Sequence, residues 1–283
     1  MNLVLGATGT IGRHLVPLLV ARGERVRIVS RDEARAKSLL GPNVELVVGS
    51  LQERAVADAA FSRVRRAFLT INSDGDQEAT ERAAFEAARR ANVEHLVKVS
   101  VIAPSADHVV HLARVHHRLE AVLAGMGVAH TILRPNWFME NFFGSATTIA
   151  QGAIYGAAGD GRVAFVGARD IAAVADCVLQ SPGRHGRDLV ITGPSALTFA
   201  DAAAEIGQGL GRPVAYTDLD EASFSGALSS AGLPPSVVDV VLQINRNARS
   251  GGLAGTTDTV LKVVGRHPLS LAAFARDNAG HLS

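Results

Sequence analysis

The chain has 283 residues, a length that fits one large domain or a domain with a smaller lobe attached to it. Hydrophobic residues make up 47% of the chain and charged residues 19%, which is enough to bury a sizeable core and excludes wholesale disorder. The 28 basic and 27 acidic residues leave a formal charge of +1, whereas a nucleic-acid surface usually needs a clear positive excess. We therefore expect no nucleic-acid partner.

A single cysteine, Cys177, excludes an intrachain disulfide and a metal cage of thiolates, and it favours a reducing compartment. The first residues contain neither a basic leader nor an apolar run near the roughly 18 residues that a membrane span needs. The histidines show no metal-ligand spacing. These features predict a cytoplasmic globular protein without a membrane partner or a bound metal.

Short β-branched runs alternate with longer helical patterns through the first half of the chain. The runs that are apolar enough for strands buried on both faces are 3–5, 25–29, 44–48, 67–71, 95–99 and 130–133. The segments with apolar residues at helical spacing are 13–22, 32–40, 53–60, 76–91 and 109–126. This alternation predicts an α/β fold with a parallel, doubly wound sheet of Rossmann type.

After Pro135 the regular alternation stops. The expected features are an aromatic, mixed segment at 136–150, a glycine-punctuated loop around 153–155, a strand at 163–166, a helix at 170–179 capped by Asp170, and a strand at 189–192 that rejoins the main sheet. The helix-rich C-terminal part is expected to contain 199–210, 214–219, 235–245 and 271–278. We expect a first domain over 1–135 and a smaller lobe over 136–283, with 163–192 returning to the first sheet.

A glycine-rich turn follows the first predicted strand and opens the first predicted helix. Gly6 permits a tight turn, Gly9 lets the backbone approach a pyrophosphate, and Gly12 lets the helix pack closely on the strand. The pyrophosphate would then lie at the positive end of a helix. This strand–turn–helix context predicts a dinucleotide site whose contacts are Gly6, Thr8, Gly9, Thr10, Ile11, Gly12 and Arg13.

The end of the second predicted strand indicates which dinucleotide is bound. An acidic residue there would bond the ribose 2′-hydroxyl, but this chain has Ser30 and Arg31, and a guanidinium can grip a 2′-phosphate. The pair predicts NADPH, although Arg31 and Arg13 could instead be solvated surface arginines. The remaining predicted cofactor contacts are Ser50 and Leu51 near the adenine, Thr70, Ile71 and Asn72 near the middle of the cofactor, and Val99, His116, Pro135 and Asn136.

Several motifs recur together in one known family. They are Gly6-Ala-Thr-Gly-x-x-Gly, Val-Lys-Val-Ser at 97–100, His116-x-x-x-Glu120, the run from Leu133 to Asn141, Arg-Asp-Ile-Ala at 169–172 and Gly-Arg-x-Pro at 265–268. Over nearly its whole length the chain resembles the NmrA-like branch of the atypical short-chain dehydrogenases/reductases. The resemblance implies a Rossmann fold. It also implies either an NADPH-dependent quinone, ketone or imine reductase or a regulator that binds the dinucleotide without turnover.

A typical short-chain reductase uses a serine and a Tyr-x-x-x-Lys pair, and this chain departs from that pattern. Ser100 fits the place of the serine, but the tyrosine position falls at about Leu112 and the lysine position at His116. Tyr155 and Tyr216 are the two tyrosines, and neither lies in that helix. The protein therefore either takes its proton from water or another group, or it is not an enzyme.

The candidate catalytic residues are Ser100 and His116. An imidazole at His116 could donate a hydrogen bond to a cofactor ribose or to a developing oxyanion, or it could simply bond backbone on the helix face. Ser100 could bond a substrate oxygen, or it could satisfy backbone at the end of the strand.

The segment after the sixth predicted strand combines aromatic and amide side chains. Ligands of open α/β sheets bind outside the carboxyl ends of the strands, and aromatic faces suit a flat, conjugated substrate. The alternative is that these aromatic residues are core of the second lobe. The predicted substrate contacts are Ser100, Asn136, Trp137, Phe138, Asn141 and Phe142.

The leading hypothesis is an NADPH-dependent reductase, a monomer or homodimer. It would transfer hydride to a ketone or quinone carbonyl of a small aromatic molecule, a class that includes molecules of polyketide type. A quinone tolerates the missing tyrosine because conjugation stabilises the hydroquinone anion. The alternative is a non-catalytic regulator that senses NADP(H), which would also lack a catalytic tyrosine.

Overall fold

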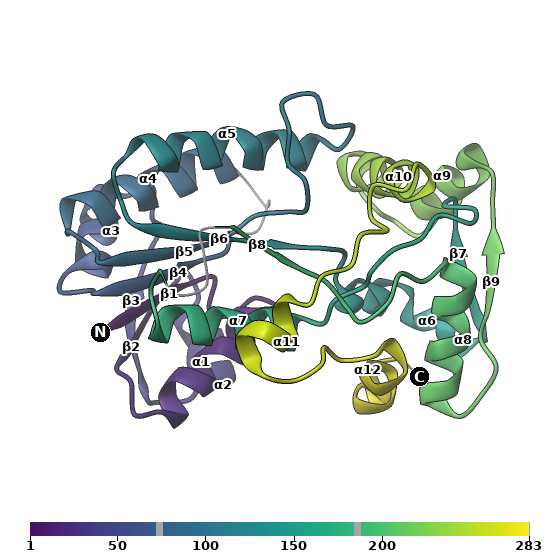
Figure 1. Cartoon of the computed structure of the whole chain (residues 1–283), viewed down its shortest axis with the longest axis horizontal. Coiled ribbons are helices and arrows are strands. Elements are labelled where there is room, and N and C mark those ends of the chain that lie inside the picture. Colours follow the sequence, from purple (N-terminus) through teal and green to yellow (C-terminus); the bar gives the residue numbers. More distant parts are fainter. Residues whose placement is uncertain (72–75, 184–187, 283) are drawn as a thin grey trace.

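The computed structural model describes residues 1–71, 76–183 and 188–282. Within these residues, seven parallel strands form one sheet in the order β3-β2-β1-β4-β5-β6-β8 (Figure 1). The strands are β1 (Asn2–Leu5), β2 (Val26–Ser30), β3 (Val44–Val48), β4 (Arg66–Leu69), β5 (His95–Val99), β6 (His130–Pro135) and β8 (Asp188–Ile191). The strand order reverses direction at β1, so the chain winds outward from this strand on both sides.

Helices cover both faces of the sheet, which is why the strands read as almost continuous apolar runs. One face packs against α1 (Gly12–Ala21), α2 (Glu33–Leu40), α7 (Ala168–Gln180) and α11 (Thr259–Val264). The other face packs against α3 (Arg54–Phe61), α4 (Gln77–Arg90) and α5 (His111–Gly125). Figure 1 shows these two layers below and above the sheet.

The second lobe lies beyond the carboxyl ends of the strands (Figure 1). Its elements are the 3₁₀ helix η1 (Met139–Ser145), α6 (Ala146–Ala150), β7 (Ala153–Gly156), α8 (Phe199–Leu210), β9 (Ala215–Asp218), α9 (Glu221–Ser230), α10 (Pro235–Arg249), α12 (Leu271–Asp277) and α13 (Ala279–Leu282). β7 and β9 pair in parallel as a separate two-stranded sheet. The lobe has its own buried core, in which Phe165, Phe199 and Phe274 are at most 5% exposed.

The C-terminal part of the chain crosses between the two lobes. After α10, Leu253 accepts a hydrogen bond from the Ala164 backbone, and Thr257 binds Thr192 and the Val190 carbonyl beside β8. α11 then packs on α7 under the sheet, with Val260 fully buried in that core. The chain returns to the second lobe at α12, which packs on α8.

The predicted α/β fold is confirmed, and the strand expected at 189–192 is present as β8, one residue earlier, where it pairs with β6. Each helix expected in the first half is present within one or two residues of its predicted ends. None of the helices among residues 1–71, 76–183 and 188–282 is long and apolar enough to cross a membrane.

Four expectations for the second half were wrong. Residues 153–155 belong to strand β7 rather than to a loop, and 214–219 contains strand β9 rather than helix. The expected strand at 163–166 forms only isolated bridges, from Val166 to Phe138 and from Val163 to Leu197. Asp170 does not cap α7, because Gly167 occupies that position. The buried carboxylate of Asp170 instead accepts the Leu269 N–H and pairs with Arg266.

Candidate functional site

The glycine-rich turn connects β1 to α1 at the point where the strand order reverses. At such a switch point the connections diverge and leave a crevice that open α/β sheets use for ligands. Gly6 adopts a φ of +75°, and a Cβ on it would lie 2.1 Å from the carbonyl oxygen of Thr70 on the neighbouring strand connection. A Cβ on Gly12 would lie 2.3 Å from the Gly6 carbonyl. Only glycine fits at both positions, so the turn is held tightly against the sheet.

The start of α1 has no side-chain cap. Ile11 occupies its N-cap and provides no side-chain hydrogen bond, and no acidic residue lies in the first turn. The N–H groups of Arg13, His14 and Leu15 bond the Gly9 and Ile11 carbonyls, so an approaching anion would meet the N–H groups that precede them, at the positive end of the helix dipole. Gly9 and Arg13 are exposed beside them. This combination fits the pyrophosphate of a dinucleotide.

Ser30 ends β2 and Arg31 follows it, at the same edge of the sheet. The Ser30 hydroxyl donates to the Asp32 carbonyl at 2.9 Å and accepts the Asp32 N–H at 3.1 Å. Asp32 itself caps α2, and its carboxylate accepts the Arg35 N–H. Arg31 is exposed and forms no ion pair with any described residue. The carboxylate of the adjacent Asp32 is therefore engaged by its own helix, which leaves the Arg31 guanidinium available for an anion.

The predicted contacts at the ends of β3 and β4 lie along the same edge. Ser50 is half-buried and accepts the Gln52 N–H through its hydroxyl, and Leu51 is 7% exposed. Thr70 and Ile71 are half-buried next to the glycine turn. Asn72, which was predicted to contact the middle of the cofactor, lies outside the described residues.

A buried polar network lies between β5, α4 and α5. Lys98 is completely buried, and its Nζ lies 2.9 Å from Oε2 of Glu81, 3.0 Å from the Val99 carbonyl oxygen and 3.0 Å from Nδ1 of His116. Gln77 donates to Glu81 at 2.9 Å and lies 3.4 Å from Nε2 of His116. The sheet pleat and the helix repeat therefore bring together residues far apart in the sequence.

The network determines what His116 can do. Burial and the neighbouring Lys98 lower the pKa of His116 to about 2. Burial likewise lowers the pKa of Lys98, against the opposing effect of Glu81. His116 is therefore neutral at physiological pH and carries no imidazolium proton to give to a substrate. Its predicted contact with the cofactor stays a prediction, and both ring nitrogens have neighbours within the protein.

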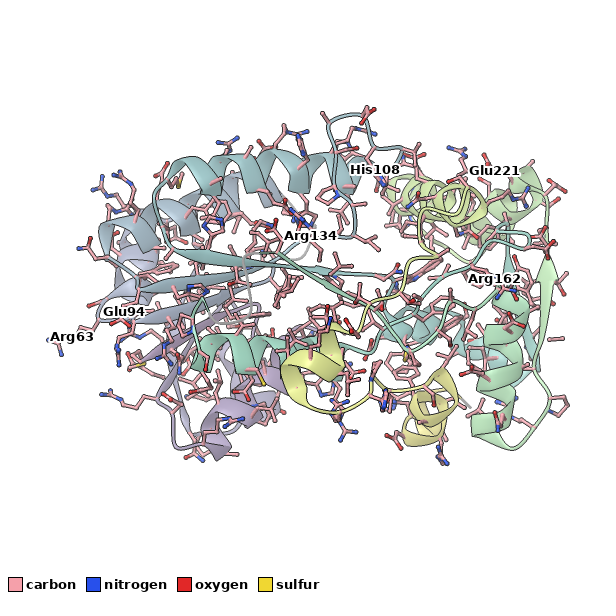
Figure 2. The ribbon with its side chains drawn as sticks, viewed as in Figure 1. Arg63, Glu94, His108, Arg134, Arg162 and Glu221 are labelled. Atoms are coloured by element: carbon pink, nitrogen blue, oxygen red, sulfur yellow. The ribbon has the colours of Figure 1, made fainter. Side chains whose placement is uncertain are left out.

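Ser100 lies two residues beyond Lys98 and faces the same helix layer. Its hydroxyl donates to Glu120 at 2.5 Å, and the Glu120 carboxylate accepts two hydrogen bonds from Arg134 at 3.1 and 2.6 Å. Figure 2 marks Arg134 between the sheet and α5. Lys98 and Ser100 thus pair with His116 and Glu120, which are one helical turn apart on α5. The Ser100 hydroxyl could still accept one hydrogen bond from a ligand.

Val99, Pro135 and Asn136 end the neighbouring strands and are all buried. The Pro135 carbonyl accepts the Ile102 N–H. The Asn136 amide donates to the Leu253 carbonyl at 2.8 Å, and its oxygen accepts the Trp137 N–H at 2.8 Å. Asn136 therefore ties the end of β6 to the segment that returns toward α11.

The second lobe contains a cavity of about 600 Å³, which we call the lobe cavity. Of the predicted substrate contacts, Trp137, Asn141 and Phe142 line it, whereas Ser100, Asn136 and Phe138 do not. Trp137 packs edge-on against Phe199 with ring centroids 5.2 Å apart, and Phe142 contacts Phe165 at the same distance. Trp137 and Phe142 therefore serve both as core of the lobe and as lining of its cavity.

The sequence did not predict several residues of the buried polar network and of the lobe cavity. It did not predict that Glu81 meets Lys98 or that Gln77 meets Glu81 and His116, because nothing local to α4 indicates which strand residue it covers. It also missed Tyr155, which lines the lobe cavity from β7. Tyr216 is half-buried instead, where its hydroxyl donates to Asp218 and burial raises its pKa. A lysine at an inward-facing strand position was the one signal available for the network.

Comparisons with known proteins agree with this geometry. A family model described as NAD(P)H-binding matches residues 6–182. The chain is 34% identical to NAD(P)H azoreductase of Xenophilus azovorans over 280 residues, which cover 99% of this chain and 98% of that protein.

Solved structures share the whole architecture. The NADPH-dependent quinone oxidoreductase of Escherichia coli, solved in complex with NADPH, matches with a TM-score of 0.89 and 29% identity, covering 98% of this chain and 99% of that one. NmrA, a negative transcriptional regulator solved in complex with NADP, matches with a TM-score of 0.82 and 18% identity over 98% of this chain and 94% of its own. At that identity the second match concerns the fold alone.

Proposed function

Because the chain belongs to the NAD(P)H-binding family, in its NmrA-like branch of atypical short-chain dehydrogenases/reductases, we propose that it is an NADPH-dependent reductase of quinones or comparable conjugated carbonyl compounds. The observation that carries this proposal is the pairing of two features. An open, positively charged helix start lies at the switch point of the sheet, and an aromatic-lined cavity follows the carboxyl end of β6. The quinone oxidoreductase and the azoreductase among its relatives support an aromatic acceptor.

Residues 1–135 would hold the cofactor and residues 136–283 the acceptor. The turn from Gly6 to Gly12 and the start of α1 would bind the pyrophosphate, and Arg31 would grip the 2′-phosphate. When bound, NADPH supplies a hydride, which together with one proton converts a quinone to its hydroquinone and leaves NADP⁺. The lobe cavity would orient the acceptor and exclude water from it.

The proton would come from solvent rather than from a side chain of the sheet. Neutral His116 has no proton to spare, and the Ser100 hydroxyl is donated to Glu120. We assign Ser100 and His116 positioning roles, in which they hold α5 in register with β5 beside the nicotinamide end of the site. A quinone needs no strong acid, because its reduced anion is already stabilised by conjugation.

The test is turnover of NADPH, followed by the loss of its absorbance, against a panel of quinones, azo compounds and aromatic ketones. We expect turnover of at least one quinone and tighter binding of NADPH than of NADH. Tight NADPH binding without turnover of any panel member would contradict the reductase and support the sensing regulator. A protein that bound neither nucleotide would contradict both. We also propose a cytoplasmic location and a monomer or homodimer, which fractionation and light scattering would check.

A further inference from the structure

The lobe cavity has two sides of different chemistry. The side built by η1 and α6, directly after β6, presents Trp137, Asn141, Ser145 and Thr148, which combine an aromatic face with hydrogen-bonding groups. The side built by α9 and α10 presents aliphatic and aromatic residues. Its members are Phe224, Leu228, Leu233, Val240, Val241 and Ile244. Most of the polar side chains in the lining therefore lie at one end of the cavity, and Asn245 is the polar residue on the α10 side.

The cavity is much larger than one aromatic ring. An apolar cavity of about 150 Å³ is enough to hold benzene, whereas the lobe cavity measures about 600 Å³. A ring placed against Trp137 would leave most of the α9 and α10 side unfilled. Because apolar surface gains free energy when it leaves water, a ligand that covers this side binds more tightly than a ring alone.

The lining also indicates what the rest of the ligand cannot be. Within the described residues it contains no Asp, Glu, Lys, Arg or His side chain. Asn245 is the buried amide on the α10 side, and its groups are already used: its oxygen accepts the Ala157 N–H and its nitrogen donates to the Val241 carbonyl. A phosphate, sulfonate or carboxylate on this side would lose its hydration without a counter-charge.

We infer that the acceptor is an uncharged quinone or similar aromatic carbonyl compound that carries an aliphatic chain. Its ring lies against Trp137 and Asn141, and its chain runs along α9 and α10. This inference rests on the proposed function for the ring and adds the chain as the part that α9 and α10 recognise.

A series of ubiquinone analogues tests the inference, because its members share one head group and carry no chain or a progressively longer saturated chain up to decyl. Full burial of one methylene favours binding roughly fourfold. We expect KM to fall by at least about twofold per methylene over the first carbons, with kcat almost constant. Concentrations stay below those at which the analogues aggregate.

Fluorescence provides a second readout that needs no turnover. Trp137 is the single tryptophan of the chain and lines the cavity, so a quinone bound there quenches its emission. The dissociation constants from quenching should follow the same chain-length order. If no quinone is reduced but quenching still tightens with chain length, the proposed reductase fails and the chain subsite stands.

Matched variants on α9 and α10 locate the subsite. Ala227 lines the cavity and Ala222 lies on the same helix outside the lining, both exposed. Ala227→Phe should weaken binding of the decyl analogue at least about fivefold more than binding of the chainless one, whereas Ala222→Phe should change neither. Val240→Thr and the exposed Val237→Thr repeat the comparison on α10 with a smaller change of shape.

Equal KM and equal quenching constants across the series would overturn the inference even if every analogue is reduced. So would a chain-length preference that survives in Ala227→Phe, because the chain would then bind elsewhere. An anionic analogue that binds as tightly as the decyl compound would also overturn it.

Discussion

The layer under α5 and the lobe cavity differ in their polar side chains: the layer is rich in charged groups that pair with one another, and the described part of the cavity lining has none. Under α5, Lys98, His116, Ser100 and Glu120 are buried or half-buried, and each has a partner within the protein. The cavity has about 600 Å³ of space and no charged side chain in its described lining. In the function we propose, Ser100 and His116, at the positions that the family resemblance gives to the catalytic serine and lysine, support the sheet. In that proposal, recognition of the acceptor depends on shape and apolar surface in the other lobe.

Removing Glu81 tests the supporting role most severely. Glu81→Ala would leave the Lys98 ammonium buried without its counter-charge, and we expect the free energy of unfolding to fall by about 3–5 kcal/mol. Glu78→Ala is the matched control on the same helix, where the pairs with Arg82 and Arg118 are partly solvated and should contribute less than about 1 kcal/mol. Urea unfolding measures the loss of unfolding free energy in both variants. Equal losses would mean that the buried pair has no special importance.

A methyl group on Gly6 would disturb the cofactor turn. Gly6→Ala combines a left-handed backbone, which costs about 1–3 kcal/mol, with a clash against Thr70. Gly23→Ala shares the φ of +75° but meets no atom within 4 Å. We expect more than about tenfold weaker NADPH binding for the first variant and unchanged binding for the second, by calorimetry. Unchanged binding in Gly6→Ala would move the pyrophosphate away from this turn.

The neutral state of His116 predicts a pH dependence of stability. Its folded pKa of about 2 lies below the ordinary 6.5, so between these values the unfolded chain binds a proton that the folded chain does not. The contribution is complete above pH 6.5 and declines as the pH falls, by at most about 1.4 kcal/mol per unit. His116→Gln should flatten the unfolding profile between pH 6 and 4 relative to wild type. His117→Gln, the half-buried neighbour, should leave that slope as it is.

Replacing Arg31 should have the smallest of these effects, and a selective one, because it should weaken binding of NADPH more than binding of NADH. Arg31→Glu replaces a cation by an anion where the 2′-phosphate is expected, so NADPH binding should weaken at least about tenfold more than NADH binding. Arg25→Glu makes the same change of net charge just before β2. It should weaken both nucleotides little and equally, because it lies at the opposite end of that strand. Equal losses of NADPH and NADH in Arg31→Glu would withdraw the 2′-phosphate assignment.

The two regions also differ in how far the sequence predicted them. Apolar runs such as 95–99 and the helical spacing of 109–126 are local signals, and they led to the correct sheet. β7 and β9 were missed because each is a short segment that becomes a strand only by pairing with the other, which lies about sixty residues away. For Lys98 the sequence indicated only its place in the Val-Lys-Val-Ser motif, and its buried contacts were not predicted. Its partners come from two helices, and their side chains meet it only once the layers are packed.

The path of α11 has a consequence for synthesis on the ribosome. Val260 is buried against α7 in the core beneath the sheet, yet it follows β6, which ends at Pro135, by more than a hundred residues. The residues of β1 to β6 therefore emerge long before the layer that covers them is complete. A nascent chain stopped before α11 would expose an apolar patch beside α7, and chaperones bind such patches. This layer of the core is completed only after residues 259–264 have been made, when α11 docks beneath the sheet.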